Sequence, residues 1–121
     1  SEIVRLLPPD MKLEGMLCKT ARQPASMSAS EIATKDIEVL KDYFKNYAVR
    51  DGSVVEKEIN GMPAYIYAAN YKEQGKKKVE YRAYYVAGSR VFWFVFRMDR
   101  DQFEREKATL DELIEGLTVE Q

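Results

Sequence analysis

The sequence contains no histidine and only one cysteine among its 121 residues. Histidine is the commonest general base and the commonest metal ligand of proteins, so the chain lacks the usual residue for either role. A single cysteine excludes an internal disulfide and a cysteine-rich zinc site. The sequence also has no glycine-rich phosphate loop, no His-Glu-x-x-His motif and no Gly-x-Ser-x-Gly motif. We therefore expect no catalytic residues, no metal and no cofactor.

Long apolar runs and an excess of charge are missing as well. The longest apolar run, Val91 to Phe96, is far shorter than the roughly 18 residues that a membrane-spanning helix needs. The 19 basic and 20 acidic side chains leave a net charge of −1, which gives no overall attraction to nucleic acid. We expect no nucleic-acid partner and no transmembrane segment. The localisation stays open: we expect a soluble domain, extracytoplasmic if a leader or lipobox precedes Ser1.

What is present suits a single domain over residues 1–121. Its composition, 45% hydrophobic and 32% charged, is that of an ordinary globular chain. Residues 1–28 are expected to be irregular apart from two short strands, Ile3–Leu7 and Gly15–Ala21. A loop is expected over Gln23–Ser30, where small and polar residues cluster.

A first helix is expected over residues 29–47. Ser28 and Glu31 have the spacing of a capping box, in which each side chain bonds the backbone of the other residue. Apolar residues then recur at helical spacing, and charged residues occupy the opposite side. The apolar stripe consists of Ala33, Ile37, Leu40, Phe44 and Tyr47.

Residues 53–98 have the pattern of a four-strand antiparallel meander. Asn60-Gly61 is a strong hairpin signal, because both central residues of that turn need positive φ. Gly88-Ser89 is a second two-residue turn, whereas Lys72–Lys77 indicates a longer connection built around Gly75. Strands joined in this way are antiparallel neighbours.

The turn at Gly88-Ser89 fixes the register of the strands on either side of it. It places Ala87 opposite Arg90, and the pairing continues residue by residue to Glu80 opposite Arg97. Both faces of this strand pair are then apolar, which is typical of a sheet that is covered on both sides.

A second helix, expected over residues 99–117, supplies part of that cover. Asp99 is placed at its N-cap with Gln102 at the capping-box position, and Gly116 is placed at its C-terminal stop. A last short strand is expected at Thr118-Val119. The order of elements predicts an α+β fold, an antiparallel β-meander sheet with helices on both faces.

This order, and the residues at two places in it, resemble the Mog1/PsbP-like superfamily, which includes the bacterial DcrB-like proteins. The segment Glu58–Tyr65 is similar to the family's strand with a Gly-x-Pro-Ala-like turn, and Leu113–Leu117 is similar to its closing helix. The resemblance covers Ala29–Val119. It implies an α/β/α sandwich and a binding role rather than catalysis, with no shared catalytic residues.

Charge is unevenly distributed along the chain even though the total is near zero. Asn70–Arg90 holds six basic and two acidic residues, a net charge of +4, whereas Asp99–Gln121 holds three basic and eight acidic residues, a net charge of −5. One interpretation is a solvated turn and a solvated helix surface. The other is a basic finger that meets an acidic partner. Its candidate residues are Lys76, Lys77, Lys78 and Arg82.

Tyrosines form the second feature, since Tyr65, Tyr67 and Tyr71 share one face of a predicted strand. They indicate either cross-strand aromatic pairs on a half-buried sheet or a groove that binds a peptide or small ligand. Together with the basic residues they are the candidate partner-binding residues. The function predicted is a non-catalytic binding or accessory domain that recognises a protein partner. The alternative is a small-ligand-binding or enzymatic domain with a pocket between sheet and helix.

Overall fold

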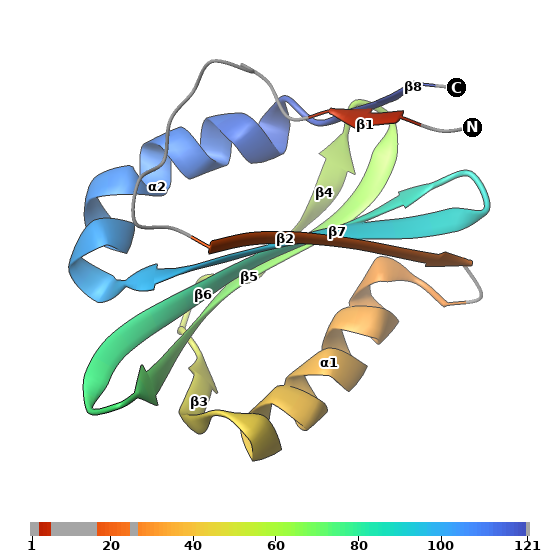
Figure 1. Cartoon of the computed structure of the whole chain (residues 1–121). Coiled ribbons are helices and arrows are strands. Elements are labelled where there is room, and N and C mark those ends of the chain that lie inside the picture. Colours follow the sequence, from red (N-terminus) through yellow and green to blue (C-terminus); the bar gives the residue numbers. More distant parts are fainter. Residues whose placement is uncertain (1–2, 6–16, 25–26, 121) are drawn as a thin grey trace.

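The computed structural model describes residues 3–5, 17–24 and 27–120. It is built from three layers, with α2 on one face of a central sheet and α1 on the other (Figure 1). The helices are α1 (Ala29–Tyr43) and α2 (Arg100–Glu115). The strands are β1 (Ile3–Arg5), β2 (Leu17–Pro24), β3 (Lys45–Val49), β4 (Val55–Ile59), β5 (Met62–Glu73), β6 (Lys76–Ala87), β7 (Arg90–Asp99) and β8 (Thr118–Glu120).

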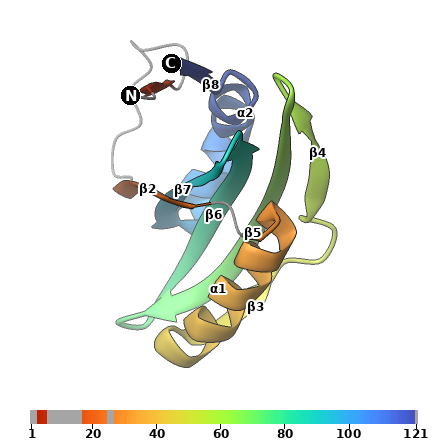
Figure 2. The same cartoon turned by 90° about the vertical axis from the view of Figure 1, so that its right-hand side faces the viewer.

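The central sheet has the order β2-β7-β6-β5-β3, and β4 also pairs with β5. Every pairing in it is antiparallel. Strands β3 and β4 lie on the same side of β5, β4 along its first half and β3 along its second half. Figure 2 shows the two helices on opposite sides of the twisted sheet. The predicted α+β sandwich with helices on both faces is therefore confirmed.

The two ends of the chain meet in a small separate sheet, in which β1 pairs with β8 (Figure 1). The predicted strand Ile3–Leu7 is confirmed at residues 3–5, and its remainder lies outside the described residues. The predicted strand Gly15–Ala21 starts outside them too, and β2 runs from Leu17. The predicted loop begins too early, because Gln23 and Pro24 still pair with β7.

Helix α1 begins as predicted and ends earlier than predicted. Ser28 is its N-cap, and the two capping-box hydrogen bonds between Ser28 and Glu31 are both 3.1 Å long. The helix ends at Tyr43, however, and residues 45–49 form β3. Asn46 takes a positive φ of 58°, which asparagine tolerates and a helix does not. The apolar spacing predicts too long a helix. Tyr47 is buried, but it lies in a strand, and its distance from the apolar residues before it also suits a helix.

Two of the hairpin turns are of the same kind. Asn60-Gly61 has φ values of 50° and 80°, and Gln74-Gly75 has 53° and 77°. Both patterns belong to the two-residue turn that matches the twist of antiparallel strands. The predicted longer connection at Lys72–Lys77 is therefore wrong. Its charged residues belong to the strands β5 and β6, which continue to the turn on either side.

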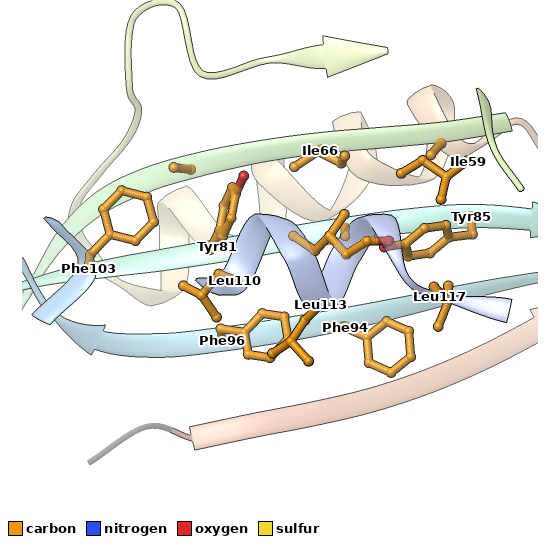
Figure 3. Close-up of a cluster of buried hydrophobic side chains, with 14 of the residues drawn as sticks. Ile59, Ile66, Tyr81, Tyr85, Phe94, Phe96, Phe103, Leu110, Leu113 and Leu117 are labelled. Atoms are coloured by element: carbon orange, nitrogen blue, oxygen red, sulfur yellow. Dashed lines mark hydrogen bonds between the residues drawn. The ribbon is translucent and has the colours of Figure 1, made fainter. Parts of the chain in front are cut away.

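The register predicted from Gly88-Ser89 is confirmed, from Ala87 opposite Arg90 to Glu80 opposite Arg97. Odd-numbered residues of β6 pack under α2, and even-numbered ones pack under α1. Figure 3 shows the α2-side core, in which Phe94 and Phe96 of β7 meet leucines of the helix. A sheet that is apolar on both faces thus has a helix on each.

Helix α2 starts after Asp99, as predicted, but the carboxylate does not cap it. The carboxylate instead forms an ion pair with Lys78 of β6, at 2.8 Å. The hydrogen bond and charge of Lys78 lower the pKa of Asp99 below its ordinary value. Gly116 is the C-cap of α2, and β8 follows it as predicted.

Candidate functional site

The structure divides the four predicted basic residues between the surface and the interior. Lys76 and Lys77 are exposed at the tip of the β5–β6 hairpin. Lys78 is half-buried and paired with Asp99. Arg82 is buried between the sheet and α1, so it is not part of a surface. The predicted set of four therefore does not form one basic face.

Two lysines outside the predicted set, Lys45 and Lys72, lie beside the exposed lysines of the tip. Lys72 of β5 lies directly opposite Lys77 of β6 on one side and directly opposite Lys45 of β3 on the other. Residues directly opposite one another project to the same face, here the face that carries α2. All three side chains are exposed, and none forms an ion pair with any part of the chain that the structure describes. We call Lys45, Lys72, Lys76 and Lys77 the basic end.

Two acids lie near the basic end. One is Asp99, which is paired with Lys78 and whose pKa the charge of Lys76 also lowers. The other, Glu73, lies opposite Lys76 across the Gln74-Gly75 turn, and the described residues show no ion pair between the two. The sequence does not reveal this row of lysines, because its apolar spacing places Lys45 in a helix, whereas the structure places it in β3. Without β3 at the edge of β5, nothing in the sequence brings Lys45 next to Lys72.

Arg82 belongs to a network in the interior. Its centre is Glu80, which is 0% exposed. The Glu80 carboxylate accepts hydrogen bonds from Arg82, from Arg97 Nε at 2.7 Å and from the Tyr47 hydroxyl at 2.9 Å. The predicted position of Glu80 beside Arg97 is thus confirmed, and the carboxylate is balanced by two guanidinium groups.

The same network ties α1 to the sheet. Asp36 of α1 accepts a hydrogen bond from the Tyr84 hydroxyl at 2.7 Å and from Arg82 Nη1 at 3.4 Å. The hydroxyls of Tyr47 and Tyr67 lie 2.7 Å apart. Burial raises the pKa of Tyr84, Tyr47 and Tyr67. These groups are satisfied by one another, so the arrangement is structural.

The predicted tyrosine face is mostly interior. Tyr67 is 0% exposed and Tyr71 is 1% exposed, both beneath α1. Tyr71 packs against the ring of Phe44, with centroids 4.5 Å apart, and burial raises the pKa of its hydroxyl to about 12. Neither residue can contact a partner that docks on the folded surface. Of the three predicted tyrosines only Tyr65 reaches the surface, so the three do not form one binding face.

Tyr65 is half-buried and lines an open groove of about 390 Å³. The groove lies between the first residues of α1 and the strands β4 and β5, at the opposite end of β5 from the basic end. Its lining, here called the Tyr65 groove, consists of Ser28, Ala29, Ser30, Glu56, Lys57, Glu58, Pro63, Ala64 and Tyr65.

A second cavity, of about 230 Å³, lies between the β3–β4 connection and α2. Arg50 at its edge forms an ion pair with Glu104 at 2.8 Å and lies over the ring of Phe103. Lys107, which also lines it, pairs with Asp111 at 2.7 Å. Within the described part of the chain, no group of three potential metal ligands comes together. No helix there is long and apolar enough to cross a membrane.

The chain was compared with protein-family models, curated sequences and solved structures. No protein-family model matches the chain, and no curated protein matches its sequence. Solved structures do match in shape. The solution structure of cyanobacterial PsbP from Synechocystis sp. PCC 6803 has a TM-score of 0.70 at 8% identity, over 98% of this chain and 82% of that one. The chain has a PsbP-like fold.

Two further solved structures also match in shape. LpqN, described as involved in cell envelope biogenesis of Mycobacterium tuberculosis, has a TM-score of 0.71 at 10% identity, over 100% of this chain and 85% of that one. A Pseudomonas aeruginosa protein of unknown function has a TM-score of 0.72 at 9% identity, over 98% of this chain and 82% of that one. Such low identities establish the fold alone, so function has to be argued from the surface of this chain.

Proposed function

We propose that this chain is a non-catalytic binding domain that recognises a protein partner through its basic end. The observation that carries the proposal is the row formed by Lys45, Lys72 and Lys77. These three like charges lie directly opposite one another across three neighbouring strands. Like charges placed this way destabilise a sheet, so the row costs stability without serving the fold.

The chain itself shows the arrangement that stability favours. One position further along β6, on the other face, Lys78 lies opposite Asp99 and forms an ion pair with it. The row has no such acid among the described residues. A partner that carries carboxylates would supply the missing charges. A cluster of this kind accelerates association with an acidic surface, and the acceleration falls as salt screens the charges.

The small-ligand alternative is supported by one observation, the volume of the Tyr65 groove. About 390 Å³ lies within the range of small-molecule sites. The groove is open, however, and small-molecule sites usually enclose most of their ligand. A surface of this shape suits a segment of a protein better, which is consistent with a binding role.

We place the domain in the cell envelope as part of this proposal. The description of LpqN as an envelope protein supports that location, although the two chains share only 10% of their residues. Fractionation of the source cell with an antibody to the domain tests the location. Recovery of the full-length protein entirely in the cytoplasmic fraction would contradict it.

The test of the proposal is the capture of partners from the source cell with the immobilised domain, followed by kinetics with each purified partner. The variant is Lys45→Glu/Lys72→Glu/Lys77→Glu. We expect association to slow by about tenfold or more, because steering by charge acts mainly on the association rate. We also expect the salt dependence of the rate to weaken.

A matched control makes the same change in net charge elsewhere. Lys35, Arg90 and Arg105 have no ion pair within the described residues and lie away from the tip. Lys35→Glu/Arg90→Glu/Arg105→Glu should associate at a rate close to that of the wild type. Equal association rates for the two triple variants would overturn the proposed role of the basic end.

A further inference from the structure

The Tyr65 groove carries charge of the opposite sign to the basic end. Glu56 and Glu58 are two residues apart on β4 and therefore project to the same face. They lie opposite Tyr65 and Pro63 of β5, and all four residues line the groove. Both carboxylates are exposed, and neither has an ion-pair partner in the described ranges.

Among the residues that the structure describes, no lysine or arginine forms an ion pair with either carboxylate. Lys57, which lies between them, projects to the other face and forms an ion pair with Glu115 of α2. Glu31, at the start of α1, is held by its hydrogen bonds with Ser28, and these bonds lower the pKa of its carboxyl. The groove therefore has an acidic rim beside an apolar floor. The apolar lining consists of Ala29, Pro63 and Tyr65, together with the backbone at Ala64.

The charge of the acidic rim acts on the hydroxyl of Tyr65. The pKa of Tyr65 is raised by partial burial and by the nearby charge of Glu56. A cation placed between them would meet a carboxylate and an aromatic ring together. This combination is the usual environment of a bound lysine or arginine side chain.

Strand β4 offers main-chain groups alongside the groove. It pairs with β5 only, and its other edge carries no strand from the described parts of the chain. Figure 2 shows β4 at the margin of the sheet. Val54 and Val55, where β4 begins, are 45% and 41% exposed. An unpaired edge of this kind can accept an extended segment as an additional strand.

We propose that β4 and the Tyr65 groove bind an extended basic segment of a protein. The segment lies along the free edge of β4 and forms main-chain hydrogen bonds with it. Its lysine or arginine side chains reach Glu56 and Glu58 on the face that carries the groove, and the apolar side chains between them project to the other face and cover Val55. This site is separate from the basic end, which lies at the other end of β5 and fits acidic partners.

The test uses peptide selection, because it assumes no particular ligand. The immobilised domain is used to select from a library of random peptides displayed on phage. We expect the enriched peptides to alternate lysine or arginine with apolar residues. The best peptide is then synthesised, and its binding is measured by calorimetry and mapped by amide chemical shifts. The shifts should centre on β4, Tyr65 and Ala29.

Reversal of the two rim charges tests whether the selected peptide binds at this site or elsewhere on the domain. Glu56→Lys/Glu58→Lys should weaken the selected peptide by about tenfold or more, since it replaces two attractions with two repulsions. The matched control, Asp42→Lys/Glu112→Lys, changes two exposed acids without a described ion pair and should leave binding unchanged. Thermal melts of both variants verify that each is folded.

Three results would overturn the proposal. They are the absence of any enriched basic peptide, equal binding to the rim variant and the control, and shifts that map elsewhere. Enriched acidic peptides that are lost in the Lys45→Glu/Lys72→Glu/Lys77→Glu variant would support the basic end and contradict the groove. If the carboxylates of β4 serve only to block edge-to-edge aggregation, the wild type will select nothing, and Glu56→Ala/Glu58→Ala, which removes both charges, will aggregate.

Discussion

Glu80 is the centre of the interior network, and its replacement tests whether that network holds α1 on the sheet. Glu80→Gln keeps the size of the side chain and removes its charge. Arg82 and Arg97 would then point at a neutral amide, and the amide nitrogen would face at least one of their N–H groups. Two positive charges would lose the carboxylate that balances them.

The size of the effect follows from burial. Glu80 is 0% exposed, so water cannot replace the lost charge. Removal of one partner from a buried ion pair costs about 3–5 kcal/mol. Arg97 keeps 21% of its side chain exposed and can be partly hydrated, which places the expected loss near the lower end of that range. The free energy of unfolding of a domain is only about 5–15 kcal/mol, so the change is large.

Urea unfolding, followed by the fluorescence of Trp93 in the α1-side core, measures this loss. The matched control is Glu104→Gln, which removes the exposed ion pair with Arg50 and should cost less than about 1 kcal/mol. If Glu80→Gln costs no more than Glu104→Gln, the network does not stabilise the fold. The attachment of α1 would then have to come from its apolar side chains alone.

Three further outcomes are expected. Gly61→Val and Gly75→Val should destabilise the domain equally in thermal melts, by roughly 1–3 kcal/mol, because both glycines have positive φ in the same kind of turn; a much milder effect at Gly75 would contradict that turn. Tyr71 and the other buried tyrosines have pKa values above the unfolded value near 10. The unfolded state therefore loses protons first, and stability should fall as the pH rises above about 10. Tyrosinate absorbance from the buried tyrosines should appear together with the loss of circular dichroism, and their gradual ionisation before unfolding would refute this. Phe94→Ala should cost about 3–5 kcal/mol in urea unfolding, and a loss below about 1 kcal/mol would contradict its central place in the α2-side core.

The sequence was sufficient for those parts of the fold that depend on local patterns. The capping box at Ser28 and Glu31, the Asn60-Gly61 turn and the register set by Gly88-Ser89 are all present. Each depends on residues close together in the chain, whose conformational preferences are strong. The register also predicted the contact of Glu80 with Arg97, which is distant in sequence and follows from counting along two strands.

The parts that failed depend on pairing between distant segments. The end of α1 was misplaced because the apolar positions around Tyr47 suit either a helix or a strand, and only pairing with β5 decides. The same error hid Lys45 from the basic end. Arg82 and Tyr67 are predicted to lie at the surface but are buried beneath α1. The sequence of a strand does not show which of its two faces a helix will cover.

The predicted hairpin tip is present, but it does not expose all of the predicted basic residues. Lys76 and Lys77 are exposed at the hairpin, but Lys78 is engaged by Asp99. Residues that alternate along a strand project to opposite faces, so a run of three lysines cannot form one surface. A binding face assembled across strands needs the neighbouring strands to be known first.

The central claim is that the basic end contacts a protein partner, and site-specific photo-crosslinking tests it most directly. A photoreactive amino acid is placed at Lys76 in one variant and at Arg105 of α2 in another, and both are expressed in the source cell. The account predicts a covalent adduct with a partner from position 76 and none from position 105. Adducts from position 105 but not from position 76, or no adduct from either position, would contradict it.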